Sequence, residues 1–192
     1  EPMRYGEENH VKKLTPAQKK RFNFIKGNVL DSYEFKADVV AAFNFSYFIF
    51  KKRSELLSYF KKVREGISDK GAFFLDIFGG SECYEPLEEE TEFKNFSYYW
   101  DLDKFNPVTS ECLYYIHFKS HKDKVKYERV FTYDWRMWTI VEIREILEEA
   151  GFSKSFLFWE DEDEEGEGNG EFYISDEEEN CLSWVSYILA IP

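Results

Sequence analysis

The chain has 192 residues, of which 43% are hydrophobic and 20% are aromatic. This is the length of one globular domain that can bury a sizeable core, and no apolar run is long enough to cross a membrane as a helix. The three cysteines, Cys83, Cys112 and Cys181, are far apart and odd in number. That pattern excludes a disulfide scaffold or a paired-cysteine zinc knuckle and predicts a reducing compartment, the cytoplasm.

The net charge of −13 is concentrated in one segment. Residues 160 to 179 hold twelve Asp and Glu and no Lys or Arg, whereas the rest of the chain is close to neutral. Phosphate binding requires clustered Lys and Arg, so the composition disfavours nucleic acid as a partner.

We expect residues 160–180 to form a mobile acidic loop. The spacing of Asp161, Asp163 and Glu165 imitates the start of an EF-hand calcium loop. The position of the closing bidentate Glu is occupied by Phe172, and the flanking segments look like strands rather than helices. We therefore predict no metal site in this chain.

The first part of the chain predicts helix, strand, strand, helix and strand. Thr15 and Pro16 can start a short basic helix, and residues 22–25 look like a strand. Residues 37–43 form an apolar run typical of a strand covered on both faces. A helix over 54–65 and a buried strand over 72–78 follow, an order that favours parallel strands joined by helices.

The pattern changes at residue 81. Residues 96–100, 111–119 and 124–133 look like strands without intervening helices, so 81–134 is predicted to be an antiparallel β insertion. Thr139 and Glu142 form a capping-box pattern that starts another helix. Two strands, 152–159 and 182–191, close the chain on either side of the acidic segment.

Polar and aromatic side chains follow the predicted buried strands. In open α/β sheets, ligands bind beyond the carboxyl ends of parallel strands. The most informative of these ends is Asn44-Phe45-Ser46-Tyr47, which combines an amide, a hydroxyl, a phenol and an aromatic face. That set suits a ligand with flat and polar parts, but a loop that satisfies its own backbone remains an equal alternative.

The order and spacing of these segments resemble a class I S-adenosylmethionine-dependent methyltransferase. The resemblance rests on residues 27–31, the strand 37–43 entering 44–47, the helix and strand up to 78, and the Trp135–Thr139 run before a helix. It implies one domain over 1–192 with a Rossmann-like α/β sheet, helices on both faces and an antiparallel last strand. The insertion 81–134 would form a cap over the substrate.

Two features of that family have no counterpart here. They are the glycine-rich loop after its first strand and the acidic residue that ends its second strand. We therefore expect the N-terminal strands to lie in a missing N-terminal segment of a longer protein or in a second subunit, and this chain alone to bind the cofactor poorly.

The resemblance assigns roles to individual residues. Asn28 would accept a hydrogen bond from the adenine amino group, with Val29 and Leu30 beside it. Asn44, Phe45 and Ser46 would line S-adenosylmethionine near its sulfonium, a cation that aromatic faces favour. Methyl transfer is an in-line displacement that needs positioning more than an acid or base. Tyr47 and His117 are nevertheless the candidates for catalytic side chains.

The cap is rich in aromatic residues that could bind a small, partly aromatic or amine-bearing substrate. Our candidates are Tyr98, Trp100, Tyr133 and Trp135, with Arg136 as a clamp for a carboxylate. For each of them a packing role in an aromatic core is the simpler alternative, and His117 can equally be a structural hydrogen-bonding residue. We expect methyl transfer to a small molecule; the alternative function is a catalytically silent methyltransferase-like binding subunit.

Overall fold

The computed structural model describes residues 2–163, 166 and 168–192. Its contacts divide the chain into two compact units, residues 1–31 and 32–192. None of the helices in the described part of the chain has the length and apolar character needed to cross a membrane.

The N-terminal unit is helical and short. It contains the helices α1 (Pro2–Asn9), η1 (Val11–Lys13) and α2 (Pro16–Lys19). Thr15 caps α2 as predicted, in a capping box with Gln18. The strand predicted at residues 22–25 is wrong, because this segment is irregular in the structure. No strand of the same unit lies beside it to supply ladder hydrogen bonds.

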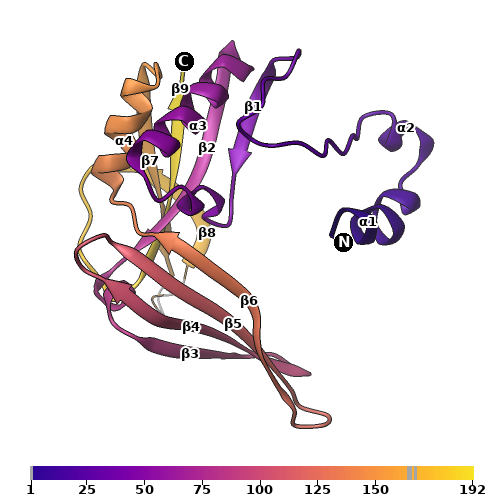
Figure 1. Cartoon of the computed structure of the whole chain (residues 1–192), viewed down its shortest axis with the longest axis vertical. Coiled ribbons are helices and arrows are strands. Elements are labelled where there is room, and N and C mark those ends of the chain that lie inside the picture. The colour runs from indigo at the N-terminus through magenta and orange to yellow at the C-terminus, as the bar shows by residue number, and fades with distance from the viewer. Residues whose placement is uncertain (1, 164–165, 167) are drawn as a thin grey trace. The chain divides into compact units, whose positions relative to one another are not determined.

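The second unit is α/β and contains two sheets (Figure 1). Sheet A has the strand order β1-β2-β9-β7-β8, and sheet B is the antiparallel meander β3-β4-β5-β6. The strands of sheet A are β1 (Ala37–Ala42), β2 (Ile67–Gly79), β7 (Lys154–Glu162), β8 (Gly168–Ile174) and β9 (Trp184–Ile191). The strands of sheet B are β3 (Leu87–Glu92), β4 (Phe96–Asn106), β5 (Glu111–Ser120) and β6 (Lys126–Arg136).

The strand directions in sheet A agree with the prediction. β1 and β2 are parallel, with Ala42 opposite Leu75. The last strand, β9, runs antiparallel to both β2 and β7. The carboxyl ends of β1 and β2 therefore meet at one edge of the sheet, which is the geometry that a ligand site at the strand ends requires.

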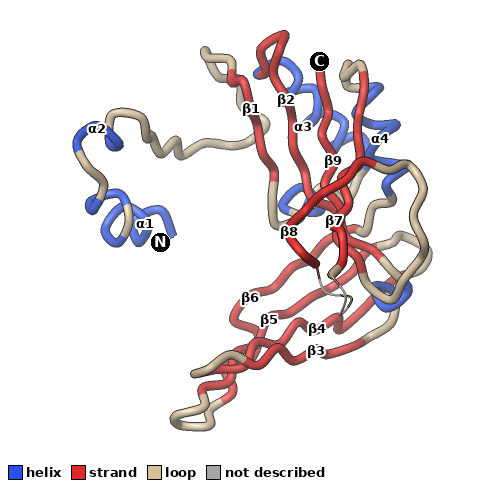
Figure 2. Tube along the Cα trace, turned by 180° about the vertical axis from the view of Figure 1, so that it is seen from behind, coloured by secondary structure: helices blue, strands red, loops and turns tan. Residues whose placement is uncertain are grey.

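Both helices of this unit pack on the same face of sheet A. α3 (Arg53–Gly66) contacts α4 (Ile140–Glu149), and Figures 1 and 2 show the two helices on one side of the strands. Helices on both faces, as the resemblance implied, are thus not found within residues 32–192. The core lies under these helices and includes the fully buried side chains of Leu56, Phe60, Phe73, Leu75, Ile77, Ile143, Ile146 and Ile188.

The opposite face of sheet A is apolar and exposed. Val39 on β1 is 60% exposed, and Val185 on β9 is 46% exposed. The expectation that residues 37–43 are covered on both faces is therefore wrong for the described unit. β1 is the edge strand of sheet A, so no neighbour within residues 32–192 covers its outer side.

The acidic segment 160–180 contains a strand that the sequence did not predict. β7 continues to Glu162, and β8 pairs with it through Gly168–Ile174. Residues 164, 165 and 167, part of the EF-hand-like run, lie outside the described residues. The segment thus extends the sheet by one strand, where a loop was expected.

Candidate active site at the strand ends

Residues 44 and 45 form a tight turn at the carboxyl end of β1. Asn44 has φ 58° and Phe45 has φ 52°, in the left-handed region that non-glycine residues rarely adopt. Two consecutive residues in this region cost backbone energy that the surrounding structure must offset. The short helix η2 (Ser46–Ile49) begins directly after them.

Asp76 of β2 holds this turn in place. Its carboxylate accepts the backbone N–H of Asn44 at 2.6 Å and that of Phe45 at 2.8 Å. The Tyr47 hydroxyl donates to the Asp76 carbonyl oxygen at 2.9 Å. The backbone donors of the turn are therefore used internally, and the side chains of the exposed residues Asn44 and Ser46 remain available on the surface.

The carboxyl group of Asp76 is 7% exposed. Burial raises its pKa above the ordinary value, and the hydrogen bonds from Phe45 and Asn44 partly counteract that rise. Asp76 is not among the site residues predicted from the sequence. Its signal was a single acidic side chain within the apolar run 72–78.

Tyr47, a predicted catalytic residue, is a buried part of this turn. Its side chain is 1% exposed, and its hydroxyl already donates to Asp76. Burial raises the pKa of Tyr47 well above the ordinary value, with the Asp76 charge adding to the effect. The structure thus gives Tyr47 a positioning role in the turn.

Phe45 connects the turn to an aromatic cluster. Its ring centroid lies 4.5 Å from that of Phe78 near the end of β2 and 6.3 Å from that of Trp135 on β6. Phe78 in turn lies 6.4 Å from Trp100 and 5.9 Å from Tyr114. These contacts place one face of sheet B directly beside the strand ends of sheet A.

Three of the predicted substrate residues come together on that face. Trp135 lies 4.4 Å from Tyr133 and 6.1 Å from Trp100, and Trp100 stacks on Tyr114 at 4.7 Å. Tyr98 lies further along β4, against Phe118. Trp100, Tyr114, Tyr133 and Trp135 form what we call the aromatic cluster of the cap.

Arg136 lies outside this cluster. Its guanidinium stacks 3.8 Å from the ring centroid of Trp138, donates to Glu142 at 2.9 Å and donates to the Lys51 carbonyl at 3.1 Å. These contacts tie the end of β6 to the beginnings of α3 and α4. The group predicted to clamp a substrate carboxylate is thus paired within the protein.

His117 lies on the opposite face of β5 from Tyr114, three residues away along a strand. Its Nδ1 accepts the backbone N–H of Arg129 at 2.8 Å, and its Nε2 lies 3.1 Å from Asp101. An imidazole whose Nδ1 is an acceptor carries its proton on Nε2 when neutral. His117 therefore donates to Asp101 and does not face the aromatic cluster.

His117, Asp101 and Glu88 could also be viewed as a metal site, since their ligand atoms lie within 4.8 Å of one another. The tautomer opposes this, because a metal would need the nitrogen that carries the proton. Glu88 is also paired with Lys126 at 2.8 Å. His117 is thus hydrogen-bonded to Asp101, and Glu88 is paired with Lys126.

The fold was compared with solved structures. The chain superposes on an S-adenosylmethionine-dependent methyltransferase from Clostridium acetobutylicum with a TM-score of 0.66 and 14% identity, covering 99% of this chain and 70% of that one. With the methyltransferase CcbJ from Streptomyces caelestis the TM-score is 0.60 and the sequence identity 16%. The superposition covers 86% of this chain and 62% of CcbJ. With the glycopeptide N-methyltransferase MtfA in complex with S-adenosyl-L-homocysteine the TM-score is 0.56 and the sequence identity 14%. The superposition covers 96% of this chain and 66% of MtfA.

The chain has the class I methyltransferase fold. It spans between 62% and 70% of the length of these three proteins. No protein-family model matches the sequence, and no curated protein matches it. The likeness to methyltransferases is thus carried by the arrangement of the elements.

In this methyltransferase fold the predicted cofactor residues divide between the two units. Asn44, Phe45 and Ser46 form the strand-end turn described above. Asn28, Val29 and Leu30 belong to the N-terminal unit, where the Asn28 side chain accepts the Leu30 N–H at 3.0 Å.

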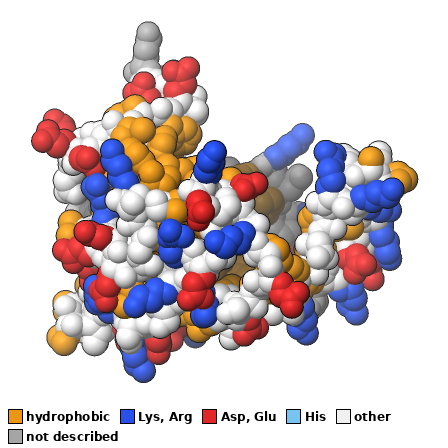
Figure 3. Space-filling view, turned by 90° about the horizontal axis from the view of Figure 1, so that it is seen from above, with side chains coloured by type: hydrophobic (Ala, Val, Ile, Leu, Met, Phe, Trp, Pro, Cys, Tyr) orange, Lys and Arg blue, Asp and Glu red, His pale blue; other side chains and the backbone are white. Residues whose placement is uncertain are grey.

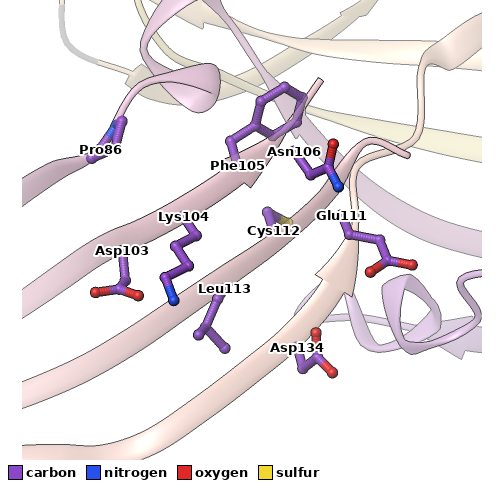
Figure 4. A pocket seen from close by; sticks show the side chains of 9 residues that line it. All are labelled: Pro86, Asp103, Lys104, Phe105, Asn106, Glu111, Cys112, Leu113 and Asp134. Carbon is purple, nitrogen blue, oxygen red and sulfur yellow. The ribbon is translucent and has the colours of Figure 1, made fainter. Parts of the chain in front are cut away.

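A hollow of about 450 Å³ is lined mainly by strands of sheet B (Figure 4). Its wall contains Asp103, Lys104, Glu111 and Asp134, and none of the predicted site residues. Lys51 pairs with both Glu111 and Asp134. Figure 3 shows a patch of hydrophobic side chains on one face of the molecule, with Lys, Arg, Asp and Glu side chains around it.

Proposed function

We propose that this chain is the greater part of an S-adenosylmethionine-dependent methyltransferase that acts on a small molecule. One observation carries the proposal: the turn at Asn44–Ser46 lies at the carboxyl ends of parallel strands, and Phe45 joins it to the aromatic cluster of the cap. A nucleoside cofactor and an aromatic-walled acceptor site would thereby be neighbours.

The exposed side chains at the turn match the parts of the cofactor. Asn44 offers an amide and Ser46 a hydroxyl for the polar groups of an adenosyl-methionine, and Phe45 offers an aromatic face for a cation. When bound, the cofactor would supply a methyl group on a positively charged sulfur.

The residues of this chain would act by positioning. Asp76 and Tyr47 fix the turn, so that Phe45 is held in one orientation against Phe78. A group held in a defined orientation favours in-line transfer. This suits a site in which His117 is turned away from the aromatic cluster.

We further propose that another polypeptide segment completes the site, either upstream in a longer protein or in a second subunit. β1 has an open edge and an exposed apolar face within residues 32–192, and an exposed sheet edge is a template for pairing. The three compared methyltransferases are longer than this chain. The three free cysteines support a cytoplasmic location.

The test is a thermal-shift measurement with S-adenosylhomocysteine on the complete gene product and on residues 1–192 alone. We expect stabilisation of the complete product and little or none of the shorter chain, by the mass-action relation between ligand and native state. Absence of any shift in the complete product would favour the catalytically silent binding subunit.

A further inference from the structure

A small hollow of about 40 Å³ is linked to the proposed cofactor turn through Phe78. It lies where β2 ends and η3 (Ser81–Tyr84) begins, under the aromatic cluster of the cap. Phe78 forms one wall and also contacts Phe45 at 4.5 Å. The hollow is large enough for a few atoms beyond a water molecule, so it admits one functional group of a larger ligand.

Two carboxylates line this hollow without a partner of opposite charge. Glu82 comes from η3, and Glu89 comes from β3 opposite Trp100. Within the described residues, neither side chain makes an ion pair or a hydrogen bond, and no Lys, Arg or His lines the hollow. Beside them, burial raises the pKa of the Cys83 thiol to about 11, with Glu89 and Glu82 adding to the effect.

Aromatic rings form part of the wall, together with Leu87, Leu102 and Ser183. Trp100 and Tyr114, stacked at 4.7 Å, and Phe78 all border the same space. Aromatic faces attract cations, and the attraction grows when the cation is shielded from water. Carboxylates and ring faces around one small space therefore share a preference for a positive charge.

We propose that this hollow binds the methyl acceptor through an amine in its ammonium form, held by Glu89 and Glu82 against Trp100. This proposal rests on the proposed function and specifies its acceptor as an amine. For transfer, the ammonium gives one proton to Glu89, and the freed electron pair on nitrogen attacks the methyl carbon. The carbon–nitrogen bond forms as the carbon–sulfur bond breaks. The electron pair of the broken bond stays on sulfur, which becomes a neutral thioether.

The binding step can be tested without activity. Saturation-transfer NMR would follow tetramethylammonium chloride, with tert-butanol as a neutral probe of similar size. We expect saturation transfer to tetramethylammonium in the wild type, and at least about tenfold weaker binding in the double variant Glu82→Gln/Glu89→Gln. Glu85→Gln/Glu92→Gln is the matched control, because it also removes two charges, from exposed positions outside the hollow.

A second variant tests the aromatic wall. Trp100→Leu keeps both carboxylates and removes the ring, so it should also weaken tetramethylammonium binding. Equal binding in the wild type and the double variant would overturn the proposal, as would equal signals from the neutral probe. The thermal shift with S-adenosylhomocysteine, measured on the complete gene product, separates the two hypotheses. A thermal shift without cation binding would contradict only the amine proposal. Cation binding without a thermal shift would contradict the proposed cofactor.

Discussion

The carboxylate of Asp76 accepts the backbone N–H of Phe45 at 2.8 Å across two neighbouring parallel strands. The same carboxylate accepts from Asn44, so one side chain on β2 fixes both left-handed residues that follow β1. The shape of the candidate cofactor site therefore depends on a buried carboxylate that holds the backbone of the turn.

Replacing Asp76 by Ala should lower the free energy of unfolding by about 1–3 kcal/mol, because two buried backbone donors lose their acceptor. Urea denaturation followed by circular dichroism measures the change. Asp69→Ala, at an exposed position on the same strand, is the control and should have little effect. Equal losses of unfolding free energy in the two variants would contradict a role of Asp76 in holding the turn.

The raised pKa of Asp76 predicts a dependence of stability on pH. Burial favours the protonated form in the folded state, so its contribution is fully present below the unfolded pKa and is lost as pH rises through the folded value. We expect the unfolding free energy of the wild type, relative to Asp76→Asn, to fall as the pH rises from the unfolded pKa of Asp76 through its folded pKa. A difference that rises with pH would show that the carboxylate is stabilised in its charged form.

Removing the Asn44 side chain should weaken binding of the cofactor. Asn44→Gly is the informative variant, because glycine accepts the φ of 58° and deletes only the amide. In the complete gene product we expect a roughly tenfold weaker affinity for S-adenosylhomocysteine by calorimetry. Asn95→Ala, in the turn between β3 and β4, serves as the control. An unchanged affinity would remove Asn44 from the site.

The three thiols should differ in reactivity. Cys83 and Cys112 are buried, and burial raises the pKa of Cys112 to about 12, whereas the thiolate is the reactive form. At pH 8 a thiol reagent should modify only the exposed Cys181 in the native protein and all three after denaturation. Rapid labelling of Cys112 in the native state would show that the core under the cap opens.

His117 should bind no transition metal, since its proton lies on the nitrogen that points to Asp101 and Glu88. Titration with Co²⁺ should give no ligand-field absorption that depends on this residue. The comparison is His117→Gln, whose spectrum should match the wild type. A cobalt band present only in the wild type would mean that the backbone contact to Arg129 opens to release the imidazole.

The sequence predicted those features that depend on local patterns. The cap at Thr15, the capping box at Thr139 and the parallel direction of the strands predicted over 37–43 and 72–78 are confirmed. β3 was missed because Leu87–Glu92 is mostly acidic. Its strand form comes from pairing with β4, which composition does not encode.

The candidate site was predictable in its parts and not in its connections. The aromatic residues of the cap stood out by composition, but their grouping depends on which face of each strand they occupy. His117 and Arg136 lie apart from the cluster for that reason. The role of Asp76 was hidden because its partners are 31 and 32 residues away in the chain.

Phe78 contacts Phe45 on one side and Trp100 and Tyr114 on the other. A single ring thus borders both the proposed cofactor turn and the proposed acceptor hollow. If filling one of these two sites shifts that ring, the affinity of the other must change, and the change is reciprocal. Cooperative or ordered binding of the two reactants would then be built into the junction of the two sheets.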